Sequence, residues 1–197
     1  MKRTYEKELP ADYTEVQILD MRTDKKLIVW LNVFSMVAAV LIIVGGMVYL
    51  AKKFEHIQSF IFSYRHFVFL LVSLFSYVIL HELTHGVVYK LLTGHKLTFG
   101  FSFVAAWCGV PDIYVYRTTA MLSCAAPFVI FSIALALPFF LCTTVGWKMA
   151  FLILFAVHFG GCAGDLYDLL LYFTKYRSPV TLMRDTGPTQ YFYLPRT

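Results

Sequence analysis

The sequence predicts an all-α integral membrane protein with about four transmembrane helices and a small β-hairpin between the second and third helices. Hydrophobic residues make up 59% of the chain and charged residues only 15%, whereas soluble domains carry about 25% charged residues. Four apolar stretches are each long enough to cross a bilayer, which takes about 20 residues. Between the second and third stretches, large apolar residues alternate with small or polar ones, as is typical of strands.

The four expected membrane helices begin and end where charged residues or turn signals interrupt the apolar runs. They cover residues 27–50, 66–92, 119–142 and 147–173. The first run is too long, and begins too far into the chain, for a secretory signal, so we expect it to be retained. Gly94 is expected to cap the second helix, since glycine tolerates the left-handed conformation. Pro127 and Pro138 are expected to kink or bound the third.

The segment between the second and third helices, residues 95–118, contains two β-prone runs around a turn-like Gly109-Val110-Pro111-Asp112. This pattern predicts a hairpin, and a partly inserted loop is the alternative. No separate soluble domain is expected. The chain divides into an N-terminal segment, residues 1–26, one membrane metalloprotease-like domain, residues 27–173, and a C-terminal tail, residues 174–197.

The lysines and arginines are distributed unequally between the two sides that four membrane helices would create. One side has Lys52, Lys53, Arg65 and Lys148. The side that holds both termini has Lys2, Arg3, Lys7, Arg22, Lys25, Lys26, Lys90, Lys96, Arg117, Lys175, Arg177, Arg184 and Arg196. Because basic loops stay in the cytoplasm, both termini are predicted to be cytoplasmic. Membrane orientation accounts for the net charge of +5, so nucleic acid is not an expected partner.

A five-residue motif, His81-Glu82-Leu83-Thr84-His85, lies inside the second apolar stretch. On a helix, residues four apart lie on the same face, so the two imidazoles can bind one Zn²⁺ together. Glu82 can then act as the general base of a hydrolysis. The alternatives are a chance match and two histidines hydrogen-bonded to neighbouring helices. A carboxylate at the centre of a membrane helix costs about 2.5–3.5 kcal/mol, so three ionisable residues together favour the metal site.

A catalytic zinc site normally has three protein ligands and one open position. The fourth apolar stretch offers His158, Asp165 and Asp168 as the third ligand. A rise of 1.5 Å per residue places His81 roughly 22 Å and His85 roughly 28 Å along the second helix. On the same scale, Asp165 lies roughly 27 Å along the fourth helix, His158 roughly 16 Å and Asp168 roughly 31 Å. Depth therefore ranks Asp165 first and excludes none of the three.

A glycine-rich stretch, residues 160–164, precedes Asp165. Small residues let helices approach closely, which is expected to bring Asp165 to the second helix. His158 is seven residues before Asp165 and so lies on nearly the same face. It is expected either beside the metal or substrate, or as a histidine hydrogen-bonded between helices. Asp168 is expected to be a helix-end carboxylate that reaches interfacial water, and assistance at the metal remains open.

The motif with its following glycine, together with Gly164-Asp165, resembles the site-2-protease-type intramembrane metalloproteases. The chain is more closely similar to a family of small bacterial membrane proteins regarded as zincin peptidases. The shared segments are Leu9-Pro10-Ala11-Asp12-Tyr13, Ala125-Ala126-Pro127 and Gly161–Asp168. This resemblance implies His81, His85 and Asp165 as zinc ligands, Glu82 as the catalytic residue, and a bacterial cell membrane as the setting. Site-2 proteases also carry an Asn-Pro element and a glycine after the third ligand, whereas Leu166 follows Asp165 here.

These features predict a zinc-dependent intramembrane peptidase that cleaves a membrane-associated protein or peptide near the cytoplasmic side. Its expected partners are the lipid bilayer and that substrate. The segment 95–118 is expected to hold an extended substrate by strand addition, or to be a structural re-entrant loop. The alternative function is a non-catalytic zinc-binding membrane regulator or scaffold, against which Glu82 argues because a structural site does not need it. A transporter has little room in four helices. The substrate, the cleavage site and the oligomeric state are left open.

Overall fold

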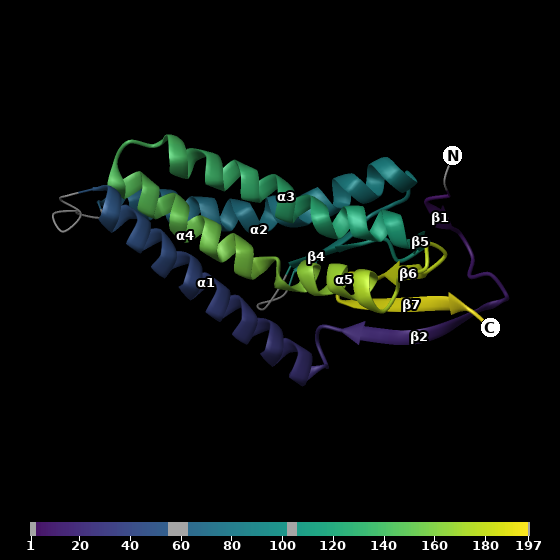
Figure 1. Cartoon of the computed structure of the whole chain (residues 1–197). Coiled ribbons are helices and arrows are strands. Elements are labelled where there is room, and N and C mark those ends of the chain that lie inside the picture. The colour runs from purple at the N-terminus through teal and green to yellow at the C-terminus, as the bar shows by residue number, and fades with distance from the viewer. Residues whose placement is uncertain (1–2, 55–62, 102–105, 197) are drawn as a thin grey trace. The chain divides into compact units, whose positions relative to one another are not determined.

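The computed structural model describes residues 3–54, 63–101 and 106–196. The helices in this part of the chain are α1 (Lys25–Lys53), α2 (Tyr64–Thr93), α3 (Arg117–Leu141), α4 (Val145–Gly161) and α5 (Ala163–Thr174) (Figure 1). The strands are β1 (Tyr5–Glu6), β2 (Tyr13–Asp20), β3 (Thr98–Phe101), β4 (Ala106–Gly109), β5 (Tyr114–Tyr116), β6 (Leu182–Asp185) and β7 (Thr189–Pro195).

Three of these helices, α1, α2 and α3, are long and apolar enough to cross a membrane, and α4 with α5 makes a fourth if the broken pair is counted as one span. The helix ends follow the local sequence signals. Asp24 Oδ1 accepts the Leu27 backbone N–H at the start of α1, as an N-cap does. Gly94 ends α2 with φ of +70°, which confirms its predicted role as a cap.

The fourth predicted helix, residues 147–173, is not continuous. It is divided at Cys162 into α4 and α5. The glycine-rich stretch meets its expected role in part. A Cβ on Gly160 would lie 3.3 Å from Ser35 of α1, one on Gly161 would lie 3.3 Å from the Tyr77 hydroxyl of α2, and one on Gly164 would meet nothing within 4 Å. The first two glycines therefore allow close helix packing, whereas Gly164 does not require it.

The prediction of an all-α fold is wrong, because the structure is 62% helical with 18% strand. A five-stranded antiparallel sheet has the order β1-β5-β6-β7-β2. Its two longest strands, β2 and β7, come from opposite ends of the chain and pair from Tyr13↔Pro195 to Asp20↔Thr189 (Figure 1). β7 also pairs with its neighbour in the sequence, β6, but β2 has no strand partner nearby in the sequence, so local patterning did not predict the pairing of β2 with β7.

The predicted hairpin is wrong as well, because most of its second run belongs to the larger sheet. β3 pairs with β4 from Thr98↔Gly109 to Phe101↔Ala106. The predicted turn, Gly109–Asp112, instead leads from β4 to β5, and β5 pairs with β1 and β6. The first β-prone run, which forms β3, therefore pairs with β4, the strand that precedes the predicted turn, and not with the run that follows the turn.

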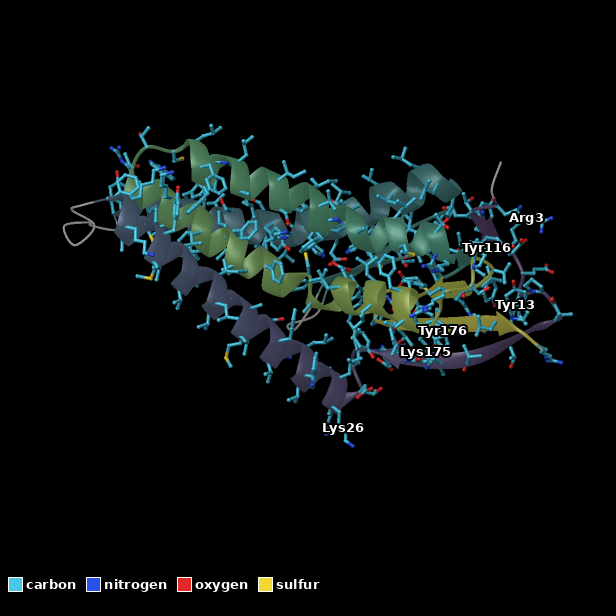
Figure 2. The ribbon with its side chains drawn as sticks, viewed as in Figure 1. Arg3, Tyr13, Lys26, Tyr116, Lys175 and Tyr176 are labelled. Carbon is cyan, nitrogen blue, oxygen red and sulfur yellow. The ribbon has the colours of Figure 1, made fainter. Side chains whose placement is uncertain are left out.

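The chain forms two compact units, which are described separately. The sheet unit comprises Met1–Val29, Ile79–Pro127 and Gly164–Thr197, and the helical unit comprises Trp30–Val78 and Phe128–Ala163. The core of the sheet unit is a cluster of buried side chains: Leu19, Tyr89, Val110, Ile113, Val115, Ala120, Tyr172, Tyr176, Met183 and Phe192. Lys175 and Tyr176 connect the end of α5 to β2, since both donate hydrogen bonds to Gln17 Oε1 (Figure 2). The His81–His85 motif and Asp165 both belong to the sheet unit.

In the helical unit, Leu70, Ala150 and Leu154 form a second buried cluster. Lys148 is only 2% exposed, and its ammonium donates to the carbonyls of Phe139 and Phe140 at the end of α3. These bonds satisfy carbonyls that have no partner within their own helix.

Candidate metal centre

Two histidines share one face of α2 because they are four residues apart. His81 and His85 are 7% and 9% exposed. Their ring centroids are 4.9 Å apart and their Nε2 atoms 3.2 Å apart. The backbone spacing of the helix thus directs two imidazole nitrogens at the same point.

Asp165, in the first turn of α5, supplies the third group. Its Oδ2 lies 3.2 Å from His81 Nε2 and its Oδ1 lies 3.3 Å from His85 Nε2. One ligand atom from each of the three residues lies within 4.8 Å of the others. In residues 3–54, 63–101 and 106–196, no other group of three or more histidine, cysteine or carboxylate side chains has this geometry. The structure therefore brings together the three residues that the sequence ranked first.

The hydrogen bonding of His85 determines which of its nitrogens faces this group. His85 Nδ1 lies 3.0 Å from the backbone carbonyl oxygen of Ser123. A carbonyl only accepts, so Nδ1 carries the proton and the neutral ring presents a lone pair at Nε2. This is the orientation in which a metal-ligating histidine is usually held.

The donor set fits a cation. Asp165 Oδ2 is buried and, among the described residues, has no contact with a polar group outside the three side chains, its neighbour being His81 Nε2. Its charge is therefore compensated by what lies among those side chains. Zinc ligands of this kind lie about 2.0–2.1 Å from the metal, so a tetrahedral pair of ligand atoms is about 3.3 Å apart. The two Nε2 atoms are 3.2 Å apart, and each lies at a similar distance from one carboxylate oxygen, His81 Nε2 at 3.2 Å from Oδ2 and His85 Nε2 at 3.3 Å from Oδ1. Two imidazoles and a carboxylate match a zinc site with one position left open.

Glu82 lies between the two histidines in the sequence but is not one of the three grouped residues. Its carboxylate interacts with the backbone of Cys108 in β4. Gly86, one turn further along α2, allows this approach because a Cβ there would lie 2.8 Å from the Phe99 ring and 3.2 Å from Cys108 Sγ. The β3–β4 pair therefore packs against the face of α2 that carries Glu82.

A buried carboxylate outside the grouped residues, Asp185 at the end of β6, lies in the same unit. Asp185 accepts a hydrogen bond from the Tyr89 hydroxyl at 2.8 Å and another from the Gly187 backbone N–H at 2.8 Å. Burial raises the pKa of Asp185 from 3.8 to about 6, despite these two bonds. The sequence marked only the turn Asp185–Pro188 at this place. The contact with Tyr89 joins segments 96 residues apart and has no local signal.

Cys108, beside this carboxylate, keeps its proton at neutral pH. Burial, and then the negative charges of Asp185 and Glu82, raise the pKa of the Cys108 thiol from 9.0 to about 12. A thiol must lose its proton to bind a metal. Cys108 is buried in β4, and its thiol is not one of the grouped ligand atoms.

His158 lies in the helical unit, is fully buried and is hydrogen-bonded through both ring nitrogens. Nδ1 lies 3.0 Å from the Tyr77 hydroxyl and Nε2 lies 3.1 Å from the Ser132 hydroxyl. Of the two sequence-based interpretations, the described contacts match the histidine hydrogen-bonded between helices.

Asp168 follows Asp165 by three residues and is 3% exposed. Its Oδ2 accepts a hydrogen bond from Gln190 Nε2 at 2.7 Å. It therefore contacts β7 instead of reaching interfacial water, because the sheet, which the sequence did not predict, covers this end of α5.

Comparisons with known proteins agree with this chemistry. The family model DUF3267, described as "Putative zincin peptidase", matches residues 74–179, which is more than half of the chain. The matched segment contains His81, Glu82, His85 and Asp165. No curated protein and no solved structure matches the chain.

Proposed function

The chain belongs to the family described as "Putative zincin peptidase", and from that premise we propose that it is a zinc-dependent intramembrane peptidase. In this proposal it cleaves a membrane-associated protein or peptide near the cytoplasmic side. The observation that carries the proposal is the group of His81 Nε2, His85 Nε2 and the Asp165 carboxylate, which has the spacing of a zinc site. Glu82, which such a site does not need for binding, lies beside it in the sequence.

His81, His85 and Asp165 would hold the zinc ion. Bound zinc supplies Lewis-acid chemistry, which polarises a carbonyl and makes water more acidic. The Glu82 carboxylate takes a proton from the attacking water while the water oxygen bonds to the scissile carbonyl carbon. Glu82 then delivers that proton to the nitrogen as the carbon–nitrogen bond breaks. Ser123 holds His85 through its carbonyl, so the Nε2 lone pair stays directed at the group.

A substrate must present its scissile amide in an extended form. Within the described residues, β4 pairs with no strand other than β3. The Val110 N–H that follows β4 donates to the Asp185 carbonyl, so we propose only the part of the other edge before Gly109 for strand addition. The Cys108 backbone on β4 interacts with Glu82. A peptide added along β4 would therefore pass close to the proposed catalytic residue, which supports β4 as the strand that holds the substrate.

The proposal is tested by comparing wild type with Glu82→Gln, Asp165→Ala and Asp168→Asn in cells. Zinc per purified chain is measured by mass spectrometry, and new N-termini in the membrane proteome are labelled and identified. Glu82→Gln should keep its zinc and lose about 10²–10⁴-fold in cleavage rate, because it can no longer accept a proton. Asp165→Ala should lose both zinc and cleavage. Asp168→Asn, a buried carboxylate outside the ligand group, is the matched control and should keep its zinc.

If Glu82→Gln yields the same new N-termini as wild type at the same rate, the peptidase proposal is wrong. If wild type and Glu82→Gln both hold zinc and neither yields any new N-terminus, the non-catalytic zinc-binding scaffold is the better description. Full zinc content in Asp165→Ala would reject Asp165 as the third ligand.

A further inference from the structure

One backbone carbonyl of α3, that of Ser123, is hydrogen-bonded to a side chain of another helix. In an α-helix, each carbonyl normally accepts the N–H of the residue four positions later. Four positions after Ser123 is Pro127, and proline has no N–H. The Ser123 carbonyl accepts its hydrogen bond from His85 Nδ1 of α2 at 3.0 Å instead.

The proline has two effects on this carbonyl. It removes the donor that would normally occupy the oxygen, and its ring crowds the carbonyl four residues earlier. Ser123 is 1% exposed, so water does not take the donor's place. A buried carbonyl without a partner costs about 1–3 kcal/mol. The His85 ring supplies the missing donor, so the two groups require each other.

A second contact lies at the same crossing of α2 and α3. The Ser123 hydroxyl donates to the backbone carbonyl of His85 at 3.5 Å. The Ser123 carbonyl thus contacts the His85 ring, and the Ser123 hydroxyl contacts the His85 backbone carbonyl. His85 and Ser123 therefore have a fixed register, and the ring has little freedom to turn over.

The consequence reaches the metal group through the tautomer of His85. With the proton fixed at Nδ1, the neutral ring offers a lone pair at Nε2, which lies 3.3 Å from Asp165 Oδ1 and 3.2 Å from His81 Nε2. With the proton on Nε2, the lone pair would be at Nδ1, which faces the Ser123 carbonyl rather than the metal group. The carbonyl that Pro127 frees thus selects the form of His85 that can bind a metal.

We infer that Pro127 is a positioning residue of the metal centre: it frees the Ser123 carbonyl to hold His85 Nδ1–H, so that Nε2 is ready for the cation. The inference rests on the proposed function in that the cation is taken to be zinc.

A second proline in the same helix gives a matched control. Pro138 also removes an intrahelical donor, for the carbonyl of Ala134. Ala134 and Pro138 belong to the helical unit, whereas Ser123, Pro127 and His85 belong to the sheet unit. Replacing either proline restores an N–H to α3, but only one of them is placed four residues after the carbonyl that His85 uses.

The experiment compares wild type with Pro127→Ala, Pro127→Ser and Pro138→Ala, each purified as the full chain in detergent. Zinc affinity is measured by competition with a chelator. The tautomers are read in zinc-free protein from ¹⁵N spectra of labelled histidine, recorded at a pH high enough for the His85 ring to be neutral. A His85→Gln sample identifies the His85 signals among the six histidines. Helix content by circular dichroism and elution volume establish that each variant is folded.

Both Pro127 variants should bind zinc about 10-fold more weakly, in the lower part of the range seen when a ligand's hydrogen-bond partner is lost. Their His85 signals should show a new population protonated at Nε2. Pro138→Ala should match wild type in both measurements. The inference is overturned if both Pro127 variants keep the wild-type tautomer of His85 and the wild-type zinc affinity. It is also overturned if Pro138→Ala loses as much zinc affinity as the Pro127 variants do.

The tautomer measurement separates this inference from the proposed function. If the wild-type protein binds no zinc, the proposed function fails, yet a tautomer change confined to the Pro127 variants would still establish the role of the carbonyl. If zinc binds with the same affinity to every variant and the tautomer stays unchanged, the proposed function stands and only the role of Pro127 is lost.

Discussion

At the scale of single residues, the metal centre places two imidazole nitrogens and a carboxylate 3.2–3.3 Å apart in a buried site. Such a group is unfavourable unless a cation or a proton lies among its atoms, because a buried charge needs compensation. The Ser123 carbonyl settles where one proton is, since it holds His85 Nδ1–H. A metal among the three side chains then satisfies the remaining lone pairs, including that of Asp165 Oδ2.

Asp185 is a buried carboxylate of a different kind, because its described contacts are hydrogen-bond donors rather than metal-ligating side chains. Tyr89 and Gly187 each donate one bond to it. These two bonds offset only part of the cost of removing the charge from water. The pKa therefore remains raised, at about 6.

This raised pKa predicts that the protein loses stability as pH rises. Below pH 3.8 the Asp185 carboxyl is protonated in both folded and unfolded chains, and above about pH 6 it is ionised in both. Between these values the folded chain binds more protons, so the free energy of unfolding falls with rising pH. The loss is at most on the order of 3 kcal/mol, at 1.36 kcal/mol per unit of pKa.

Asp185→Asn should lack this decline. The measurement is thermal unfolding of the zinc-free protein in detergent at pH 4 and at pH 7. From pH 4 to pH 7, the unfolding temperature of wild type should fall relative to that of Asp185→Asn. An unchanged difference between the two proteins at both pH values would contradict the raised pKa of Asp185.

At the scale of elements, α2 presents two neighbouring faces to different partners. One face carries His81 and His85 toward Asp165 of α5. The next carries Glu82 and Gly86 toward β3 and β4, where the absence of a side chain on Gly86 lets Phe99 approach. The helix thus positions the metal ligands and the proposed base by its own geometry, and the strands cover the base.

Gly86→Val should push β3 and β4 away from α2, because even a Cβ at this position would lie 2.8 Å from Phe99 and 3.2 Å from Cys108 Sγ. Overpacking of this kind typically costs about 1–3 kcal/mol. Gly45→Val is the control, since a Cβ on Gly45 of α1 meets nothing within 4 Å and both substitutions add the same β-branched residue to a helix. Thermal unfolding and the rate of substrate cleavage are the measurements.

The expected result is that Gly86→Val loses stability and cleavage while Gly45→Val keeps both. Equal stability and cleavage in the two variants would show that β3 and β4 do not need to lie against α2. Zinc content should change little in either, because the added side chain lies on the Glu82 face rather than on the histidine face.

At the scale of the whole molecule, the lysines and arginines that the sequence assigns to the two sides of the membrane also fall in different compact units. The four on the side without termini, Lys52, Lys53, Arg65 and Lys148, all belong to the helical unit. The remaining basic residues all belong to the sheet unit. The excess of lysine and arginine predicts that the sheet unit, with the metal centre and both chain ends, is on the cytoplasmic side.

Reporter fusions test this orientation. Green fluorescent protein fused to either end of the chain should fluoresce, and alkaline phosphatase fused to either end should be inactive, because both ends are expected in the cytoplasm. Phosphatase inserted after Phe54, in the connection between α1 and α2, should be active. An active phosphatase at either terminus would reject the predicted orientation and, with it, cleavage near the cytoplasmic side.

The sequence by itself determined the apolar helices, the cap at Gly94 and the two histidines with Glu82. These features depend on contacts within a few residues, and helical periodicity alone places His81 and His85 on one face. The ranking of Asp165 above His158 and Asp168 needed only a depth along each helix. The structure places Asp165 beside both histidines, His158 in a separate cluster with Tyr77 and Ser132, and Asp168 against Gln190.

Only the tertiary structure decided the sheet and the surroundings of the metal centre. β2 and β7 pair across more than 160 residues, and a strand's pattern does not identify a partner that distant. The bonds from His85 to Ser123 and from Tyr89 to Asp185 likewise join separate segments. Local propensity specified the helices that carry the ligands, whereas long-range packing specified which hydrogen bonds orient them and which strands cover them.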